Sequence, residues 1–204
     1  MANIERPIVE VRDLRADEVP AAVRLLARAF RDEPLQIATL GSDPERRRRR
    51  LRVLFSAMFE VMKAQTPLAA FDGGTMVGVT GIAPPGTCQA TSTQVLKYAW
   101  ALLSIGPRSL LRSARLNASW AAVDPKEPHS HLGPLAVDAD LHGRGIGSQI
   151  LASYCRQLDE AQLNGYLETD AEAKVRLYER FGFEVVGEKH VVGVPNWFMA
   201  RQAR

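Results

Sequence analysis

The chain has 204 residues, with 26 Lys and Arg against 23 Asp and Glu, so its formal net charge is +3. Hydrophobic residues make up 46% and charged residues 24%, a globular composition that excludes a disordered chain. No apolar run approaches the ~18 residues that a membrane-spanning helix needs, and no secretory signal is visible. We therefore expect one cytoplasmic domain over residues 1–204, with Cys88 and Cys155 as free thiols.

The first part of the chain predicts a strand, two helices and a hairpin. The β-branched residues at 8–11 favour a strand, and apolar residues at helical spacing from 19 to 30 favour a helix. A second helix is expected from Pro44 to Lys63, because its large apolar residues fall on one face. Residues 67–83 predict a hairpin that closes at Asp72-Gly73-Gly74.

Five consecutive arginines, Arg46 to Arg50, stand near the start of that second helix. On a helix they wrap around the axis and form no single stripe, so we interpret them as a solvated face. No aromatic residues interleave with them and the net charge is small, so we expect no nucleic-acid partner.

Residues 86–128 predict a helical insertion. One helix ends near Gly106-Pro107, and a second helical segment runs to about Trp120. After this segment, strands and helices can be assigned more clearly from the sequence.

The last third predicts alternating strands and helices. The strand at 132–137 should be distorted at Gly133-Pro134, because proline lacks an N–H and interior glycine often marks a bulge. This strand is followed by a glycine-rich turn and an amphipathic helix, whose buried stripe runs from Ile146 to Leu158. A strand at 165–169 and a helix at 172–180 come next. The last strand candidates are 183–186, 191–194 and 197–199, with a break at Pro195-Asn196. The order indicates a mixed α/β (α+β) domain.

The glycine-rich turn carries the strongest chemical signal. Gly143, Gly145 and Gly147 lie between a strand and a helix, where backbone N–H groups and a helix N-terminus can hold a phosphate or pyrophosphate. The P-loop is excluded because Ile146-Gly147-Ser148 lacks the lysine, and the glycine spacing does not fit a dinucleotide fingerprint. A tight turn that binds nothing is the structural alternative.

These motifs resemble those of the GNAT family of N-acetyltransferases. The loop resembles the family's Gln/Arg-x-x-Gly-x-Gly/Ala motif, and Leu177 to Phe183 resembles its LYExxGF helix end. Leu167-Glu168-Thr169-Asp170 and Tyr178 to Phe183 resemble the LETS…YERLGF pattern of puromycin-type acetyltransferases. The resemblance implies a largely antiparallel sheet with a splayed central strand pair, flanked by helices.

The resemblance also implies acetyl-CoA as co-substrate, with no metal ion. The amides of the loop would hold the pyrophosphate, the strand edge would receive the pantetheine arm, and the N–H of Leu135 would polarise the thioester carbonyl. The residues implied to bind the cofactor are Leu135, Ala136, Val137, His142, Gly143, Arg144, Gly145, Ile146, Gly147 and Ser148.

Two side chains are the catalytic candidates that the resemblance implies. The Tyr178 phenol would protonate the departing thiolate; the structural alternative is a tyrosine that only packs. Glu168 would take the proton of the acceptor ammonium; the alternatives are a solvated or salt-bridged carboxylate, or a water relay. His131 and His190 are weaker candidates for the base.

Two residues depart from the family pattern. His142 replaces the usual Gln or Arg, and Lys174 stands where an Asn often helps to hold the cofactor. We expect transfer of an acetyl group to the amine of a small molecule by direct attack in a ternary complex; the alternative is a non-catalytic CoA-binding or regulatory module. The sequence does not identify the acceptor, and a homodimer would be usual for the family.

Overall fold

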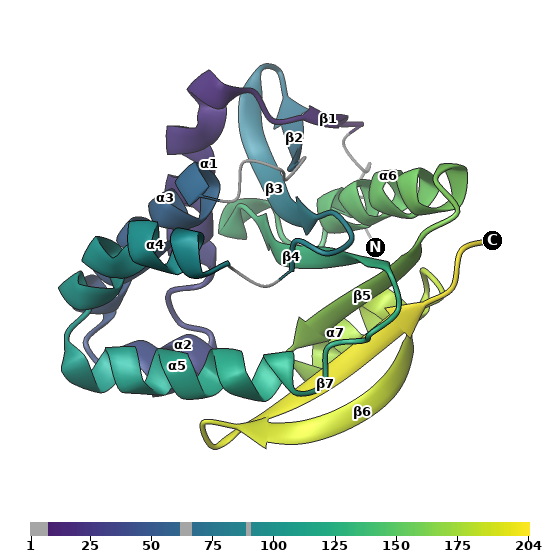
Figure 1. Ribbon diagram of the computed structural model, residues 1–204. Helices are drawn as coiled ribbons and strands as arrows, with labels where there is room; N and C mark the ends of the chain where they lie inside the picture. The colour runs from purple at the N-terminus through teal and green to yellow at the C-terminus, as the bar shows by residue number, and fades with distance from the viewer. Residues whose placement is uncertain (1–7, 62–66, 89–90) are drawn as a thin grey trace.

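The computed structural model describes residues 8–61, 67–88 and 91–204. These residues form a seven-stranded sheet in the order β1-β2-β3-β4-β5-β7-β6 (Figure 1). Within the described residues, β4 and β5 are the one parallel pair. The strands are β1 Glu10–Asp13, β2 Leu68–Asp72, β3 Thr75–Ala83, β4 His129–Val137, β5 Asn164–Thr169, β6 Glu184–Val191 and β7 Val194–Arg201. The helices are α1 Val19–Ala29, α2 Pro34–Leu40, α3 Pro44–Val61, α4 Ser92–Ser104, α5 Pro107–Ala121, α6 Ile146–Glu160 and α7 Glu172–Glu179.

The predicted fold class is confirmed: the sheet is mixed, mostly antiparallel and flanked by helices. Side chains that alternate along β2 show how the layers form. Leu68 and Ala70 pack into the core that contains α6, while Ala69 and Phe71 pack into the core that contains α1. Within the described segments, no helix combines the length and the apolar character needed to cross a bilayer.

Helices α4 and α5 occupy the segment that the sequence predicts to be a helical insertion. Together with α2, α5 covers the β5-β7-β6 part of the sheet (Figure 1). Leu35 of α2 and Leu116 of α5 pack there against Tyr166 and Phe198. The chain therefore places α5 on the sheet face opposite to α6 and α7.

The sequence analysis did not predict helix α2. Pro34 takes its first helical position, where the missing N–H of proline would have no helical acceptor. The next N–H, that of Leu35, donates to the Asp170 carboxylate at 3.0 Å. The start of α2 is thus attached to the end of β5, 135 residues away along the chain.

The predicted break at Pro195-Asn196 is wrong, since both residues lie inside β7. The turn is instead at Val192 and Gly193, which both have positive φ, as a tight hairpin turn requires. Proline is tolerated in β7 because the pairing with β5 ends at Trp197, so Pro195 stands on an open edge.

The interpretation of the arginine run as a solvated face is wrong for Arg47. Its side chain is only 3% exposed. It donates to the carbonyl oxygens of Arg31 and Gly41 and to the Asp32 carboxylate. Arg47 therefore fixes the connection between α1 and α3 from inside.

We predict that Arg47→Met lowers the free energy of unfolding by about 2–4 kcal/mol, because two backbone carbonyls lose their buried donor. The linear side chain of methionine keeps most of the packing. Urea unfolding followed by circular dichroism measures the change.

Arg48→Met is the matched control. Arg48 is 44% exposed and pairs with Glu45 one turn away, so its loss should cost no more than ~0.5 kcal/mol. Equal destabilisation by the two substitutions would show that Arg47 has no special role.

Candidate functional site

The site begins where β4 and β5 separate. The two strands pair only over His129–His131 and Asn164–Tyr166. Beyond these residues β4 continues to Val137 and β5 to Thr169 with no ladder between them. A backbone edge is therefore open between the two central strands, as the predicted splayed pair requires.

The register of β4 identifies which backbone groups face this opening. The N–H of Asp138 donates to the carbonyl of Val77 on β3 at 2.9 Å. Successive residues of a strand direct their N–H and C=O groups to opposite edges, so those of Leu135 and Val137 face away from β3. These are the two residues predicted to offer main-chain groups to a pantetheine arm.

The predicted distortion of β4 is confirmed. Thr80 pairs with Leu135 and Ile82 with Leu132, so β4 has one residue more than β3 between these pairs. A β-carbon at Gly133 would lie 3.3 Å from the carbonyl oxygen of Gly81, which is why glycine suits this close approach. The bulge precedes Leu135 directly.

The predicted phosphate loop follows β4. Gly143 and Gly145 have φ values of +78° and +83°, a conformation that favours glycine. Gly145 is the N-cap of α6, which starts at Ile146. The first-turn N–H groups of α6 have no acceptor within the helix and carry its partial positive charge. The loop thus has the form expected of an anion site.

Two side chains hold this loop on β4. The ring Nε2 of His142 lies 3.1 Å from the carbonyl oxygen of Val137 and, facing an acceptor, must donate. Asp138 accepts from the N–H of Asp140 and from the guanidinium of Arg28. His142, the departure from the family pattern, thus has a local structural contact.

Tyr178 lies in the core on the α6 side of the sheet. It is 6% exposed and packs edge-on against Phe183, with 6.1 Å between ring centroids. Burial raises the pKa of its phenol above the usual range, and the carboxylates of Glu33 and Asp170 raise it further. At neutral pH the phenol is therefore protonated, which suits a proton donor.

Glu168 lies on the opposite face of the sheet. Leu167 shares the α6-side core with Tyr178, and Glu168 is the next residue along β5. The Glu168 side chain is 6% exposed, and its Oε2 accepts a hydrogen bond from Nε2 of His131 at 2.7 Å. Among the described contacts Glu168 therefore meets His131 and not Tyr178.

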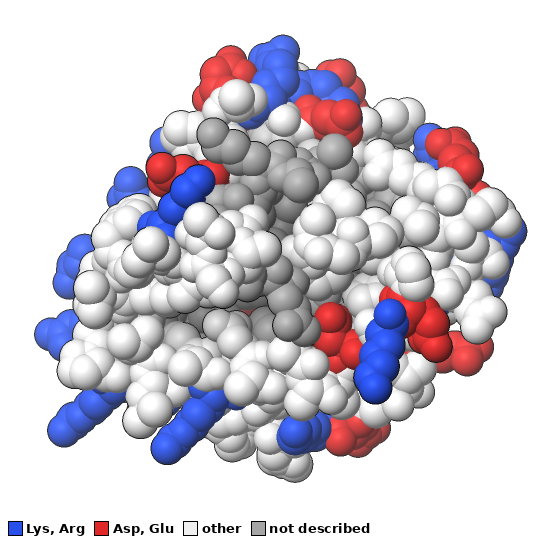
Figure 2. Space-filling model, in the orientation of Figure 1, with Lys and Arg blue, Asp and Glu red and all other residues white. Residues whose placement is uncertain are grey.

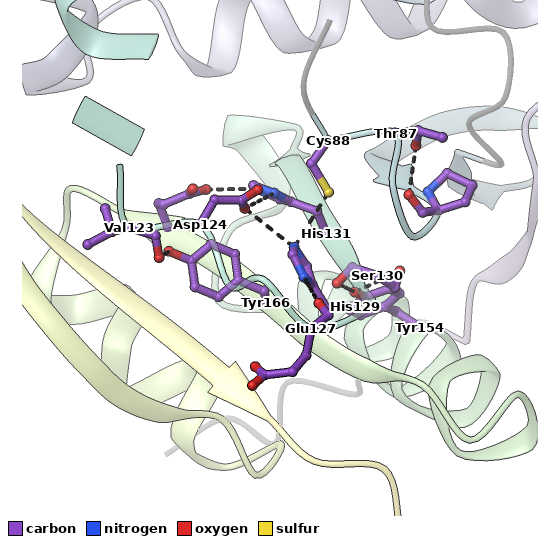
Figure 3. Close-up of polar contacts among 12 residues, drawn as sticks. Thr87, Cys88, Val123, Asp124, Glu127, His129, Ser130, His131, Tyr154 and Tyr166 are labelled. Atoms are coloured by element: carbon purple, nitrogen blue, oxygen red, sulfur yellow. Dashed lines mark hydrogen bonds and ion pairs between the residues drawn. The ribbon is translucent and has the colours of Figure 1, made fainter. Parts of the chain in front are cut away.

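His131 belongs to a cluster at the base of the opening (Figure 3). Cys88, Asp124, His129 and His131 each direct one S, O or N atom to a common region, and these atoms all lie within 4.8 Å of one another. Burial alone lowers the pKa of His131, but the Cys88 side chain and the Glu168 carboxylate outweigh it and raise the pKa to about 10. The surroundings thus favour positive charge on this ring.

Sequence reasoning missed three members of this cluster. The pattern His129-Ser130-His131 on a strand could have shown that both rings share one face. No spacing could have found Cys88 and Asp124, which follow β3 and α5 respectively. The fold brings them together.

Two further residues of the sequence analysis lie elsewhere. The Lys174 ammonium pairs with Glu33 at 2.9 Å, and so attaches α7 to the N-cap of α2. His190 is exposed on β6 and lies outside the cluster. In the face drawn in Figure 2, the Lys and Arg side chains lie mainly along the left, lower and upper edges, with Asp and Glu side chains beside them at the top and at the lower right.

Comparison with known proteins gives the same fold. The sequence model of the Acetyltransferase (GNAT) family matches residues 36–183. The structure of histone acetyltransferase HPA2 and related acetyltransferase from Corynebacterium glutamicum is 21% identical, with a TM-score of 0.72, over 96% of this chain and 97% of that chain.

Two other solved structures are similar at lower identity. The Drosophila melanogaster polyamine N-acetyltransferase, which forms N-acetylagmatine, is 15% identical with a TM-score of 0.66, over 96% of this chain and 100% of that chain. The ribosomal-protein-alanine N-acetyltransferase from Brucella melitensis is 16% identical with a TM-score of 0.56, over 95% of this chain and 99% of that chain. At these identities they establish a shared fold.

Proposed function

The chain belongs to the GNAT acetyltransferase family, and we propose that it is an acetyl-CoA-dependent N-acetyltransferase of the cytoplasm that acetylates a small-molecule amine. The observation that carries this proposal is the open edge of β4 leading directly into a glycine loop and a helix N-terminus. Acetyl-CoA has an extended pantetheine arm that carries amide groups and ends in a diphosphate. The amides can pair with the open strand edge, and the diphosphate can bind at the loop and the helix N-terminus.

Two segments of this chain would bind different parts of acetyl-CoA. The N–H groups from Gly143 to Ser148 would hold the diphosphate, since the two left-handed glycines leave the backbone exposed. The edge groups of Leu135 and Val137 would hold the pantetheine amides. Acetyl-CoA, when bound, supplies an activated acetyl group as a thioester.

The catalytic role that we assign to each group follows from its charge and its protonation state. The Leu135 N–H, just after the bulge, would donate to the carbonyl oxygen as negative charge develops on it. Glu168 uses one oxygen for His131, so its second oxygen would accept the proton of the incoming ammonium. As the carbon–sulfur bond breaks, the protonated Tyr178 would give its proton to the leaving sulfur, and the second proton lost by the nitrogen would restore the phenol. The opening between β4 and β5 would connect these two groups across the sheet.

An amine acceptor is supported by two considerations. The similar structures include a polyamine N-acetyltransferase and a ribosomal-protein-alanine N-acetyltransferase, which both acetylate nitrogen. In addition, the Glu168 carboxylate stands at the base of the opening, where its second oxygen would attract a cationic amine.

The test is a direct assay of acetyl transfer. Purified protein is incubated with acetyl-CoA and a panel of amines that contains agmatine, spermidine and an alanine-terminated peptide, and products are identified by mass spectrometry. Acetylated small amines are expected. Acetyl-CoA binding without any acetylated product would favour the non-catalytic module, and no binding at all would contradict the cofactor assignment.

We predict that Tyr178→Phe lowers kcat by about 10²-fold or more, the usual range for loss of a proton donor, without changing the Kd of acetyl-CoA more than about twofold. Rapid-quench kinetics and calorimetry measure the two quantities. Unchanged kcat would leave Tyr178 a packing residue.

Tyr154→Phe is the matched control, because Tyr154 is also buried on the α6 side. Its hydroxyl donates to the carbonyl of Ser130 at 3.0 Å, so its loss should lower stability by about 0.5–1.5 kcal/mol. It should not lower kcat. An equal loss of kcat in both variants would indicate general damage to the core.

We also predict that Gly145→Glu weakens acetyl-CoA binding at least about tenfold more than Gly145→Ala, because a carboxylate would face the diphosphate. Both variants carry the strain of a side chain at φ +83°, so their difference isolates the charge. Calorimetric titration at low and high salt measures it. Equal affinities in the two variants would place the diphosphate elsewhere.

A further inference from the structure

We propose that Cys88, Asp124, His129 and His131 bind a divalent transition-metal ion, with Zn²⁺ as the best fit. This site adjoins the proposed base Glu168 through His131 and revises the expectation, drawn from the sequence, that the protein holds no metal. Four observations support it.

The donor atoms lie close to the separations that a bound metal requires. Nε2 of His129 lies 3.5 Å from Sγ of Cys88 and 3.4 Å from Oδ1 of Asp124. Nδ1 of His131 lies 3.9 Å from the same Asp124 oxygen. A tetrahedral Zn²⁺ with ligand distances of ~2.0–2.3 Å holds its ligand atoms about 3.3–3.8 Å apart. The cluster needs only a small contraction to reach this geometry.

The outer contacts of the two histidines leave the correct nitrogen atoms available. Nδ1 of His129 lies 2.8 Å from the carbonyl oxygen of Glu127, and Nε2 of His131 lies 2.7 Å from the Glu168 carboxylate. Both partners are acceptors, so these nitrogens carry the protons. The opposite nitrogens are the ones in the cluster (Figure 3), and a metal ion that binds them would displace any proton they carry. Metal-binding histidines are typically fixed by such partners.

One of these nitrogens, Nδ1 of His131, is buried and makes no hydrogen bond within the described residues. A metal ion would satisfy it. The thiolate of Cys88 and the carboxylate of Asp124 would balance the double positive charge, and the Cys88 thiol would release its proton on binding.

The geometry does not fit a cysteine nucleophile activated by a histidine and an acid. In such a triad, the thiol and the acid contact opposite nitrogens of the ring. Here Cys88 and Asp124 both approach Nε2 of His129, while Nδ1 contacts a carbonyl oxygen. Convergence on one nitrogen is expected when both ligands surround a common centre.

The position of the ligands defines the role of the metal. Cys88 precedes α4 and Asp124 follows α5, while both histidines belong to β4. A bound ion would therefore attach both ends of the two-helix segment to the central strand. Four protein ligands leave no open coordination position, which is typical of a structural site.

The test uses the full chain, purified under reducing conditions and stripped with a chelator. Zn²⁺ should bind with a stoichiometry of one per chain and raise the Tm. Co²⁺ should produce a thiolate charge-transfer band and the strong visible bands of a tetrahedral complex. Metal content that stays at the buffer blank, or Co²⁺ spectra without a thiolate band, would overturn the proposal.

Variants separate this site from adventitious binding. Cys88→Ala and His129→Ala should weaken Zn²⁺ binding at least about tenfold, and Glu168→Gln, which removes an outer contact, about 10- to 100-fold. Cys155→Ala and His142→Ala are the matched controls, with wild-type affinity expected. Circular dichroism confirms that each variant is folded. Equal affinity in Cys88→Ala and Cys155→Ala would contradict the assignment.

Discussion

The separation of β4 from β5 is the constraint on which the rest of the structure depends. A parallel ladder that stops after three residue pairs leaves backbone donors and acceptors that need other partners. In the interior of a sheet such groups are normally paired, so an open central edge has to be filled by water or by a ligand. The bulge at Gly133 and the loop after Val137 both lie on this edge.

The two faces of the sheet carry different kinds of side chain on either side of this opening. The α6 side provides an apolar core in which the Tyr178 phenol stays protonated. The other side collects the carboxylates, imidazoles and thiol around His131. Along the described part of the two strands, β4 and β5 part beyond His131 and Tyr166, and the proposed reaction, which uses both groups, would take place in that opening.

The sequence predicted the elements whose signals are local. Gly133-Pro134 and the loop glycines Gly143 and Gly145 impose backbone shapes that few other residues adopt, and the strand-loop-helix order followed from them. Helix α2 escaped because its start depends on Asp170, and the hairpin turn was misplaced because Pro195 is tolerated only on the edge that β5 leaves open. Arg47 and Cys88 acquire their roles from contacts that only the folded chain creates.

The contacts of Glu33 and Leu35 with Lys174 and Asp170 have a consequence for how the protein is made. A ribosome releases residues 33–35 long before it has translated residues 170–174, so the N-terminal helices must wait, with their final anchors missing, until synthesis is nearly finished. Contacts so distant along the chain form slowly. The segment around residues 33–35 is thus completed late, and its apolar side chains stay exposed on the nascent polypeptide until then.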